Sequence, residues 1–146
     1  MKRVALLMIA ILTMSSTCSD DDDTFNSNTD IAEIKNVAST GVWVITYFYD
    51  TDHEETNNFT GYQFDFSSNE NLIATKNTSI VNGTWSVTSS SSSSNDVDFN
   101  ILFSTPTNFE ELSDDWEIIR YTSTKIELID ISGGNGGTDY LTFEKI

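Results

Sequence analysis

The chain has 146 residues, with 23 acidic side chains against seven Lys and Arg, and a formal charge of −16. Such an acidic protein is a poor match for nucleic acid or anionic lipid headgroups, because phosphate binding needs a basic patch. The length suits one domain with a hydrophobic core after a short leader, and it is too short for two such domains.

The first 17 residues have the features of an export signal. Lys2 and Arg3 precede an apolar stretch, Val4–Met14, and small polar residues follow it. A membrane-spanning helix needs about 20 apolar residues, so this stretch is too short to cross a bilayer. We expect residues 1–17 to be removed, which leaves five basic residues against 23 acidic ones and a formal charge of −18.

The only cysteine, Cys18, stands at the end of this leader, and Ser19 and four aspartates, Asp20–Asp23, follow it. This arrangement resembles the signal of bacterial lipoproteins, and the acidic run resembles the export tag of Bacteroidetes-type lipoproteins. The resemblance implies lipidation of Cys18, an anchor in the outer membrane and exposure on the cell surface. The alternative is an ordinary secretory signal with an incidental thiol. Residues 18–29 contain too few apolar side chains to form a core, which predicts a flexible tether.

The expected domain runs from Asp30 to Ile146. Asp30 and Glu33 have capping-box spacing, which predicts a short helix from Ile31 to about Val37. Beyond it, apolar and polar residues alternate as in half-buried strands. Eight strands are predicted: Val42–Tyr49, Thr60–Phe66, Asn71–Lys76, Ile80–Thr88, Asp96–Phe103, Trp116–Thr122, Lys125–Ile131 and Asp139–Lys145.

Turn-forming residues separate these strands, including the serine run Ser89–Ser94 and the glycine-rich segment Gly133–Gly137. One longer gap contains Phe109–Leu112, which is predicted to form a helical turn. Short strands joined mostly by tight turns favour an antiparallel meander. Closing the meander removes its exposed edges, so the sequence predicts an all-β, eight-stranded up-and-down barrel with a short N-terminal helix.

Four segments in this order carry a family resemblance: Gly41–Trp43, Gly61–Phe66, Gly83–Val87 and Leu112–Ile119. Together with the leader, they resemble the lipocalin-like domain of Bacteroidetes-type lipoproteins over roughly residues 30–146. The resemblance implies a small barrel with Trp43 at its closed end and a cation stacked on that ring. Lys145 and Arg120 are both candidates for the cation.

An eight-stranded barrel is either filled by side chains or just wide enough for one small ligand. The number of bulky residues expected to face inward favours a filled interior. These residues are Trp43, Ile45, Tyr47, Tyr62, Phe64, Phe66, Trp85, Val87, Phe99, Ile101, Phe103, Ile118, Ile126 and Leu128. The alternative is a pocket for a small apolar or amphipathic ligand, lined by Tyr47, Tyr62, Phe64, Trp85, Phe99 and Phe103.

Catalysis has little support, because the chain has one histidine and its one cysteine is assigned to lipid. Asp50–Glu55 begins like a calcium loop but carries glutamate where that motif needs its glycine, which favours an acidic hairpin loop. Gly133–Asp139 is better explained as a glycine-rich hairpin than as a calcium repeat. We therefore predict no enzymatic activity, metal site or cofactor.

Three functions follow from these features. The first is a surface-tethered lipocalin-like lipoprotein that binds a small apolar or amphipathic ligand. The second is an interaction or inhibitor protein whose acidic barrel surface binds a basic protein partner. The third is a structural accessory of an outer-membrane assembly.

Overall fold

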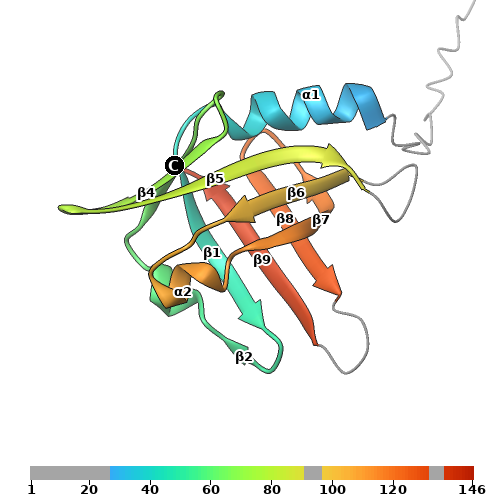
Figure 1. The fold of residues 1–146 in the computed structure, drawn as a ribbon. Coiled ribbons are helices and arrows are strands. Elements are labelled where there is room, and N and C mark those ends of the chain that lie inside the picture. The colour runs from blue at the N-terminus through green and yellow to red at the C-terminus, as the bar shows by residue number, and fades with distance from the viewer. Residues whose placement is uncertain (1–26, 91–96, 132–136) are drawn as a thin grey trace, which may run out of the picture.

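The computed structural model describes residues 27–90, 97–131 and 137–146. The leader, Cys18 and the aspartate run lie outside the described residues, as do most of the serine run and Gly133–Gly136. Figure 1 shows a barrel of strands with one helix across its upper end. The elements in chain order are α1 (Ser27–Ala38), β1 (Trp43–Asp50), β2 (His53–Glu54), η1 (Thr56–Phe59), β3 (Gln63–Phe66), β4 (Asn71–Lys76), β5 (Ser79–Ser89), β6 (Val97–Leu102), α2 (Thr107–Glu110), β7 (Asp114–Tyr121), β8 (Lys125–Ile131) and β9 (Thr138–Lys145).

The strands form a closed antiparallel barrel. From β3 to β9 each strand pairs with the next in sequence, and β1 joins β3 on one side and β9 on the other. The predicted all-β up-and-down barrel of eight strands, with a short N-terminal helix, is confirmed. The two-residue strand β2 was not predicted; it pairs with β1 in a hairpin at one end of the barrel.

Helix α1 begins at Ser27, four residues before the predicted start at Ile31, and therefore includes the last residues of the predicted tether. Asp30 consequently lies within the helix and is not its N-terminal cap. Ile34 and Ala38 are fully buried, and the helix packs against β5 and β6. Burial of this apolar face, more than a local capping signal, stabilises the helix.

Aromatic rings pack against one another inside the barrel. The ring of Phe66 meets those of Trp85, Phe99 and Phe143 edge to face, at centroid distances of 5.3, 5.5 and 5.2 Å. Near α2, Phe109 makes similar contacts with Phe103 and other rings. Each such pair contributes about 0.5–1.5 kcal/mol beyond the burial of its area. These contacts agree with the filled interior favoured by the sequence.

Tyr47 was predicted to face inward, and this prediction is wrong. The β1–β9 register shifts between Ile45 and Tyr47, as it does at a β-bulge. One extra residue reverses the alternation of all side chains that follow it. As a result Phe48 is 1% exposed and packs against Phe59 and Trp116, whereas Tyr47 is 39% exposed. Tyr62 and Ile118 are half-buried against the core, and the other residues predicted to face inward are buried.

The end of the barrel next to α1, which we call the closed end, is organised around Trp43. The indole N–H of this buried residue donates to the carbonyl of Ala38 at 2.8 Å. Lys145 Nζ lies 4.6 Å from the centre of the Trp43 ring, so Lys145 is the predicted cation. Arg120 instead pairs with Glu127. Gly41, with φ at +95°, makes the turn into β1 directly beside the Lys145 side chain.

Candidate functional site

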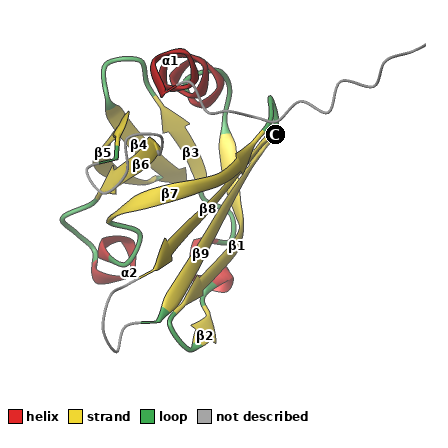
Figure 2. Cartoon of the chain, turned by 90° about the vertical axis from the view of Figure 1, so that its right-hand side faces the viewer, coloured by secondary structure: helices red, strands yellow, loops and turns green. Residues whose placement is uncertain are grey.

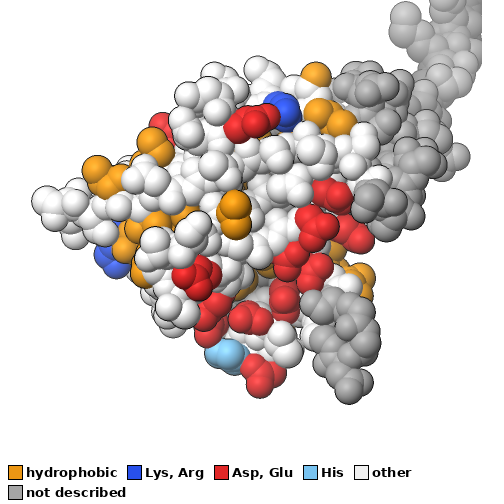
Figure 3. All heavy atoms as spheres, in the orientation of Figure 1, with side chains coloured by type: hydrophobic (Ala, Val, Ile, Leu, Met, Phe, Trp, Pro, Cys, Tyr) orange, Lys and Arg blue, Asp and Glu red, His pale blue; other side chains and the backbone are white. Residues whose placement is uncertain are grey.

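Carboxylate side chains gather at the end of the barrel opposite Trp43. Strands β1, β6 and β8 end there, β7 and β9 begin there, and the β2 hairpin and α2 lie beside them (Figure 1). We call this surface the acidic end and define it by ten residues. They are Asp50, Asp52, Glu54, Glu55, Glu110, Glu111, Asp114, Asp115, Asp130 and Asp139. Figure 3 shows acidic side chains spread over the lower half of the visible face.

One part of the acidic end lies between the β2 hairpin and α2. Burial raises the pKa of Glu111, and a hydrogen bond to Glu55 and the charges of Glu55 and Asp50 act in the same direction. The same hydrogen bond from Glu111 lowers the pKa of Glu55. His53 lies between Asp52 and Glu55, and hydrogen bonds to these two carboxylates raise its pKa. The two carboxylates therefore favour the protonated form of His53.

The other part lies where β7, β8 and β9 meet the barrel end. Burial raises the pKa of Asp114 to about 6, and contact with Asp115 and the charge of Asp130 contribute to the shift. Asp130 is the cross-strand partner of Asp139, so two acidic residues occupy one register position. Like charges placed opposite each other on a sheet destabilise it. Asp139 also accepts a hydrogen bond from the backbone N–H of Thr51 at 2.6 Å, which ties β9 to the hairpin.

The described lysines and arginines make their contacts outside the acidic end. Lys35 pairs with Glu70 at 3.4 Å, and Arg120 and Lys125 pair with Glu127 at 2.8 and 2.9 Å. Lys76 lies over the Tyr62 ring, and Lys145 over the Trp43 ring. His53, by contrast, contacts two carboxylates of the acidic end, Asp52 and Glu55.

This arrangement is suited to attracting a cationic surface. Charges of one sign on a surface raise the local concentration of oppositely charged partners and steer their approach. Across residues 27–90, 97–131 and 137–146, no three His, Cys, Asp or Glu side chains are placed to hold a metal ion together. No helix within those same ranges has the length and apolar character needed to cross a membrane.

The structure brings together five of the six residues predicted to line a ligand pocket. Phe64, Phe99, Phe103 and Trp85 are buried, and Tyr62 is half-buried against Phe109. Their rings pack against other rings of the core. Tyr47 is separated from this group, because the bulge in β1 turns its side chain outward.

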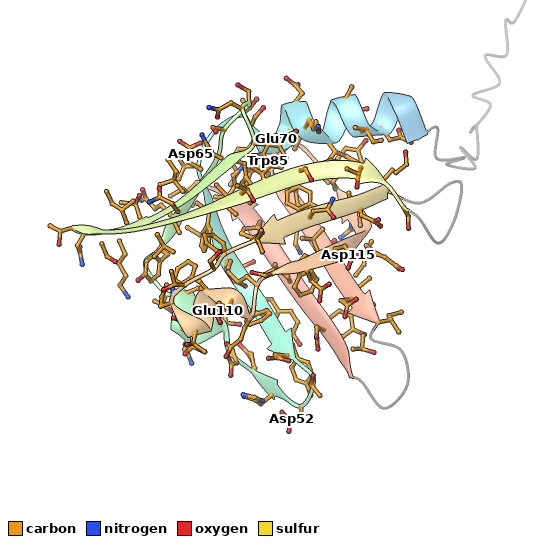
Figure 4. All side chains as sticks on the ribbon, viewed as in Figure 1. Asp52, Asp65, Glu70, Trp85, Glu110 and Asp115 are labelled. Atoms are coloured by element: carbon orange, nitrogen blue, oxygen red, sulfur yellow. The ribbon has the colours of Figure 1, made fainter. Side chains whose placement is uncertain are left out.

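Two grooves lie on the outside of the barrel near Trp85. One, of about 380 Å³, runs over β4, β5 and β6, and the other, of about 130 Å³, lies between α1 and β5. Figure 4 shows Glu70 and Trp85 beside α1, far from Asp52 and Glu110 at the acidic end. Hydroxyl and amide side chains dominate the larger groove, including Asn71, Thr84 and Asn100. Trp85, Ile101 and Leu102 add apolar surface, so this outer groove of mixed character differs from the interior pocket expected from the sequence.

The sequence pattern predicted parts of the acidic end but not that they lie together. Asp50–Glu55 was expected to be an acidic hairpin loop and Gly133–Asp139 a glycine-rich hairpin, whereas Asp130 belonged to no motif. The proximity of these parts depends on strand register, since β8 and β9 pair Asp130 with Asp139. The alternation of apolar and polar residues identifies each strand but does not say which strand ends meet.

No protein-family model matches the chain, and no curated protein matches it. The chain is similar to a solved structure, a DUF4847 family protein from Bacteroides vulgatus ATCC 8482 determined at 1.00 Å resolution. The match has a TM-score of 0.46 and 13% sequence identity, and covers 76% of this chain and 96% of the other.

Proposed function

We propose that this protein is a membrane-tethered binding module that holds a basic protein partner against the acidic end. One observation carries the proposal: carboxylates from the β2 hairpin, from the segment after α2 and from β7, β8 and β9 lie close to one another there, while the described lysines and arginines make their ion pairs and cation–π contacts with other groups. Burial and the neighbouring carboxylates raise the pKa of Asp114 and Glu111, so keeping these groups ionised costs stability. A cationic partner would stabilise the ionised carboxylates. Binding would therefore relieve the destabilisation that these charges cause in the free protein.

The leader supports the proposed location. A lipid on Cys18 would anchor the protein in the outer membrane, and Asp20–Asp23 would direct it to the outer face. Residues 18–26 can extend to at most about 30 Å, which would keep the barrel close to the bilayer. A partner bound there would be held at the cell surface.

The proposal can be tested by calorimetric titration of the mature chain, carrying Cys18→Ser, with lysozyme as a folded basic probe. The test variant neutralises three exposed carboxylates of the acidic end: Asp52→Asn, Glu110→Gln and Asp115→Asn. The control variant neutralises three exposed carboxylates elsewhere: Glu33→Gln, Asp65→Asn and Glu70→Gln. Both variants have the same net charge, so a general charge effect would weaken their binding equally.

We expect the parent chain to bind more weakly at 300 mM than at 50 mM NaCl, because salt screens exposed charges. The test variant should bind about tenfold more weakly than the parent, and the control variant within about twofold. Equal losses in the two variants would show that net charge alone is responsible. That result would contradict a site at the acidic end.

A small amphipathic ligand is the second candidate, and the groove of about 380 Å³ beside Trp85 favours it. Phe66 and Phe109 pack against other rings inside the barrel, whereas this groove is open at the surface, where a ligand can reach it. Thr84→Trp would place a large side chain in this groove. Small molecules that co-purify with the parent and are lost from this variant would support this candidate, whereas equal recovery from both would contradict it.

A further inference from the structure

A continuous row of paired residues crosses the outside of the barrel from β2 to β7. Strand pairing places Glu54 opposite Tyr49, Tyr49 opposite Tyr140, Tyr140 opposite Ile129, and Ile129 opposite Glu117. Paired residues of an antiparallel sheet point to the same face. Leu141 and Phe48, the neighbours of Tyr140 and Tyr49 along their strands, are buried, so this row faces outward.

The centre of the row is aromatic and accessible. Tyr140 is 37% exposed and Tyr47, on the same face of β1, is 39% exposed. The Tyr47 and Tyr49 rings lie nearly parallel, at 16° and 6.5 Å between centroids. Thr142, the register partner of Tyr47, is only 9% exposed although it faces outward, so neighbouring side chains cover it. We call Tyr47, Tyr49, Tyr140 and Ile129 the tyrosine strip. Figure 2 shows β1, β9, β8 and β7 side by side on this side of the molecule.

Charge complementarity indicates what the strip would bind. Glu54 and Glu117 stand at the two ends of the row, and both are exposed. Tyrosine faces attract cations, and the planar guanidinium of arginine also stacks on them. Tyrosine and arginine are enriched among the residues that dominate binding energy at protein interfaces.

We infer that the tyrosine strip is the docking surface for an extended, arginine-containing segment of the basic partner. The inference rests on the proposed function and identifies where the partner is anchored. Strands lie about 4.8 Å apart, so the path from Glu54 to Glu117 is about 19 Å long, which six extended residues can span. Guanidinium groups on alternate residues would stack on Tyr49 and Tyr140, while the outer basic groups pair with the two glutamates.

The test uses the mature chain carrying Cys18→Ser and two peptides, Ac-(Arg-Thr)4-amide and its lysine analogue, in calorimetric titrations at 50 mM NaCl. Alternate residues of an extended peptide face the same side, so four arginines can meet the strip together. The double variant Tyr49→Leu/Tyr140→Leu keeps apolar bulk but removes the aromatic faces. The matched control Tyr49→Phe/Tyr140→Phe keeps the aromatic faces and removes only the hydroxyl groups. Thermal melting checks that both variants fold.

The arginine peptide should bind the parent more tightly than the lysine peptide. The leucine variant should bind the arginine peptide about tenfold more weakly, and the phenylalanine variant within about twofold of the parent. If the leucine variant binds the peptide like the parent, the strip is not the docking surface. The proposed function would survive that result if the acidic-end variant still bound lysozyme more weakly.

Two other results would also overturn the inference. The first is that neither peptide binds the parent chain. The lysozyme titration would still test the proposed function independently. The second is self-association, detected if the parent sediments as a dimer and the leucine variant as a monomer. The strip would then be covered by a second copy of this chain and not by a basic segment.

Discussion

The two ends of the barrel use charged residues in opposite ways. At the closed end a single cation, Lys145, lies over the buried ring of Trp43 and donates to the Val37 carbonyl at 3.3 Å. At the other end burial, together with neighbouring carboxylates, raises the pKa of Asp114 and Glu111, and His53 contacts Asp52 and Glu55. Charge at the closed end therefore stabilises the fold, whereas charge at the acidic end weakens it. A partner of opposite charge would relieve this destabilisation, which favours the acidic end as a binding surface.

The largest expected effect is at the closed end. Trp43→Ala removes a fully buried ring together with its hydrogen bond to Ala38, and should lower the free energy of unfolding by about 4 kcal/mol. Urea unfolding followed by circular dichroism measures this loss. Tyr47→Ala, at an exposed aromatic, is the control and should change stability by less than about 1 kcal/mol. Comparable losses in the two variants would contradict the assignment of Trp43 as the organising residue.

Replacing the cation gives a smaller effect at the same end. Lys145→Met keeps most of the apolar stem but removes the charge over Trp43, and should cost about 1–2 kcal/mol in urea unfolding. Arg120→Met is the control, since Arg120 pairs with Glu127 on the surface, and should cost less than about 0.5 kcal/mol. A larger loss for Arg120 than for Lys145 would be inconsistent with the structure.

Removing one negative charge from the acidic end should instead raise the free energy of unfolding. The pKa of Asp114 is raised from an ordinary 3.8 to about 6, so between these values the folded state holds more protons than the unfolded state. Stability therefore falls as the pH rises through this window. Because Asp114 is partly solvated, Asp114→Asn should stabilise the fold at pH 7.5 by only about 1 kcal/mol, and by nothing near pH 3.

Urea unfolding of the Asp114→Asn variant at several pH values measures this change. Asp65→Asn, at an exposed carboxylate on β3, is the control and should show no such gain at pH 7.5. Destabilisation by Asp114→Asn at pH 7.5 would mean that the Asp114 carboxylate is held by a favourable partner.

The smallest effect concerns His53, whose pKa should lie above 6.5 because it contacts Asp52 and Glu55. Since its folded pKa is raised, the stabilisation is fully present below pH 6.5 and is lost as the pH rises through the folded value. The chain has one histidine, so its ring proton resonance can be titrated by NMR without assignment. Asp52→Asn and Glu55→Gln should each lower the pKa of His53. An unchanged pKa in both variants would contradict the contacts of His53 with these two carboxylates.

Much of the fold followed from local pattern. Alternation in segments such as Tyr62–Phe66 identified the strands, and the Gly41–Trp43 resemblance placed Trp43 at the closed end. The bulge in β1 was not predictable in this way, because the sequence Trp43–Asp50 alternates plausibly on either face until β9 sets the register. Phe59 was not among the residues expected to face inward, although it is a core residue that packs against Phe48 and Phe109.

By itself, the sequence determined the fold class, the order of the strands and the strong acidity of the chain, because periodicity and composition are local properties. Tertiary structure decided which of Lys145 and Arg120 meets Trp43, and that Tyr47 faces solvent. It also decided that carboxylates as distant in sequence as Asp50 and Asp139 share one end of the barrel. These outcomes depend on strand register and barrel closure, which join residues far apart in the chain and leave no signal in any single segment.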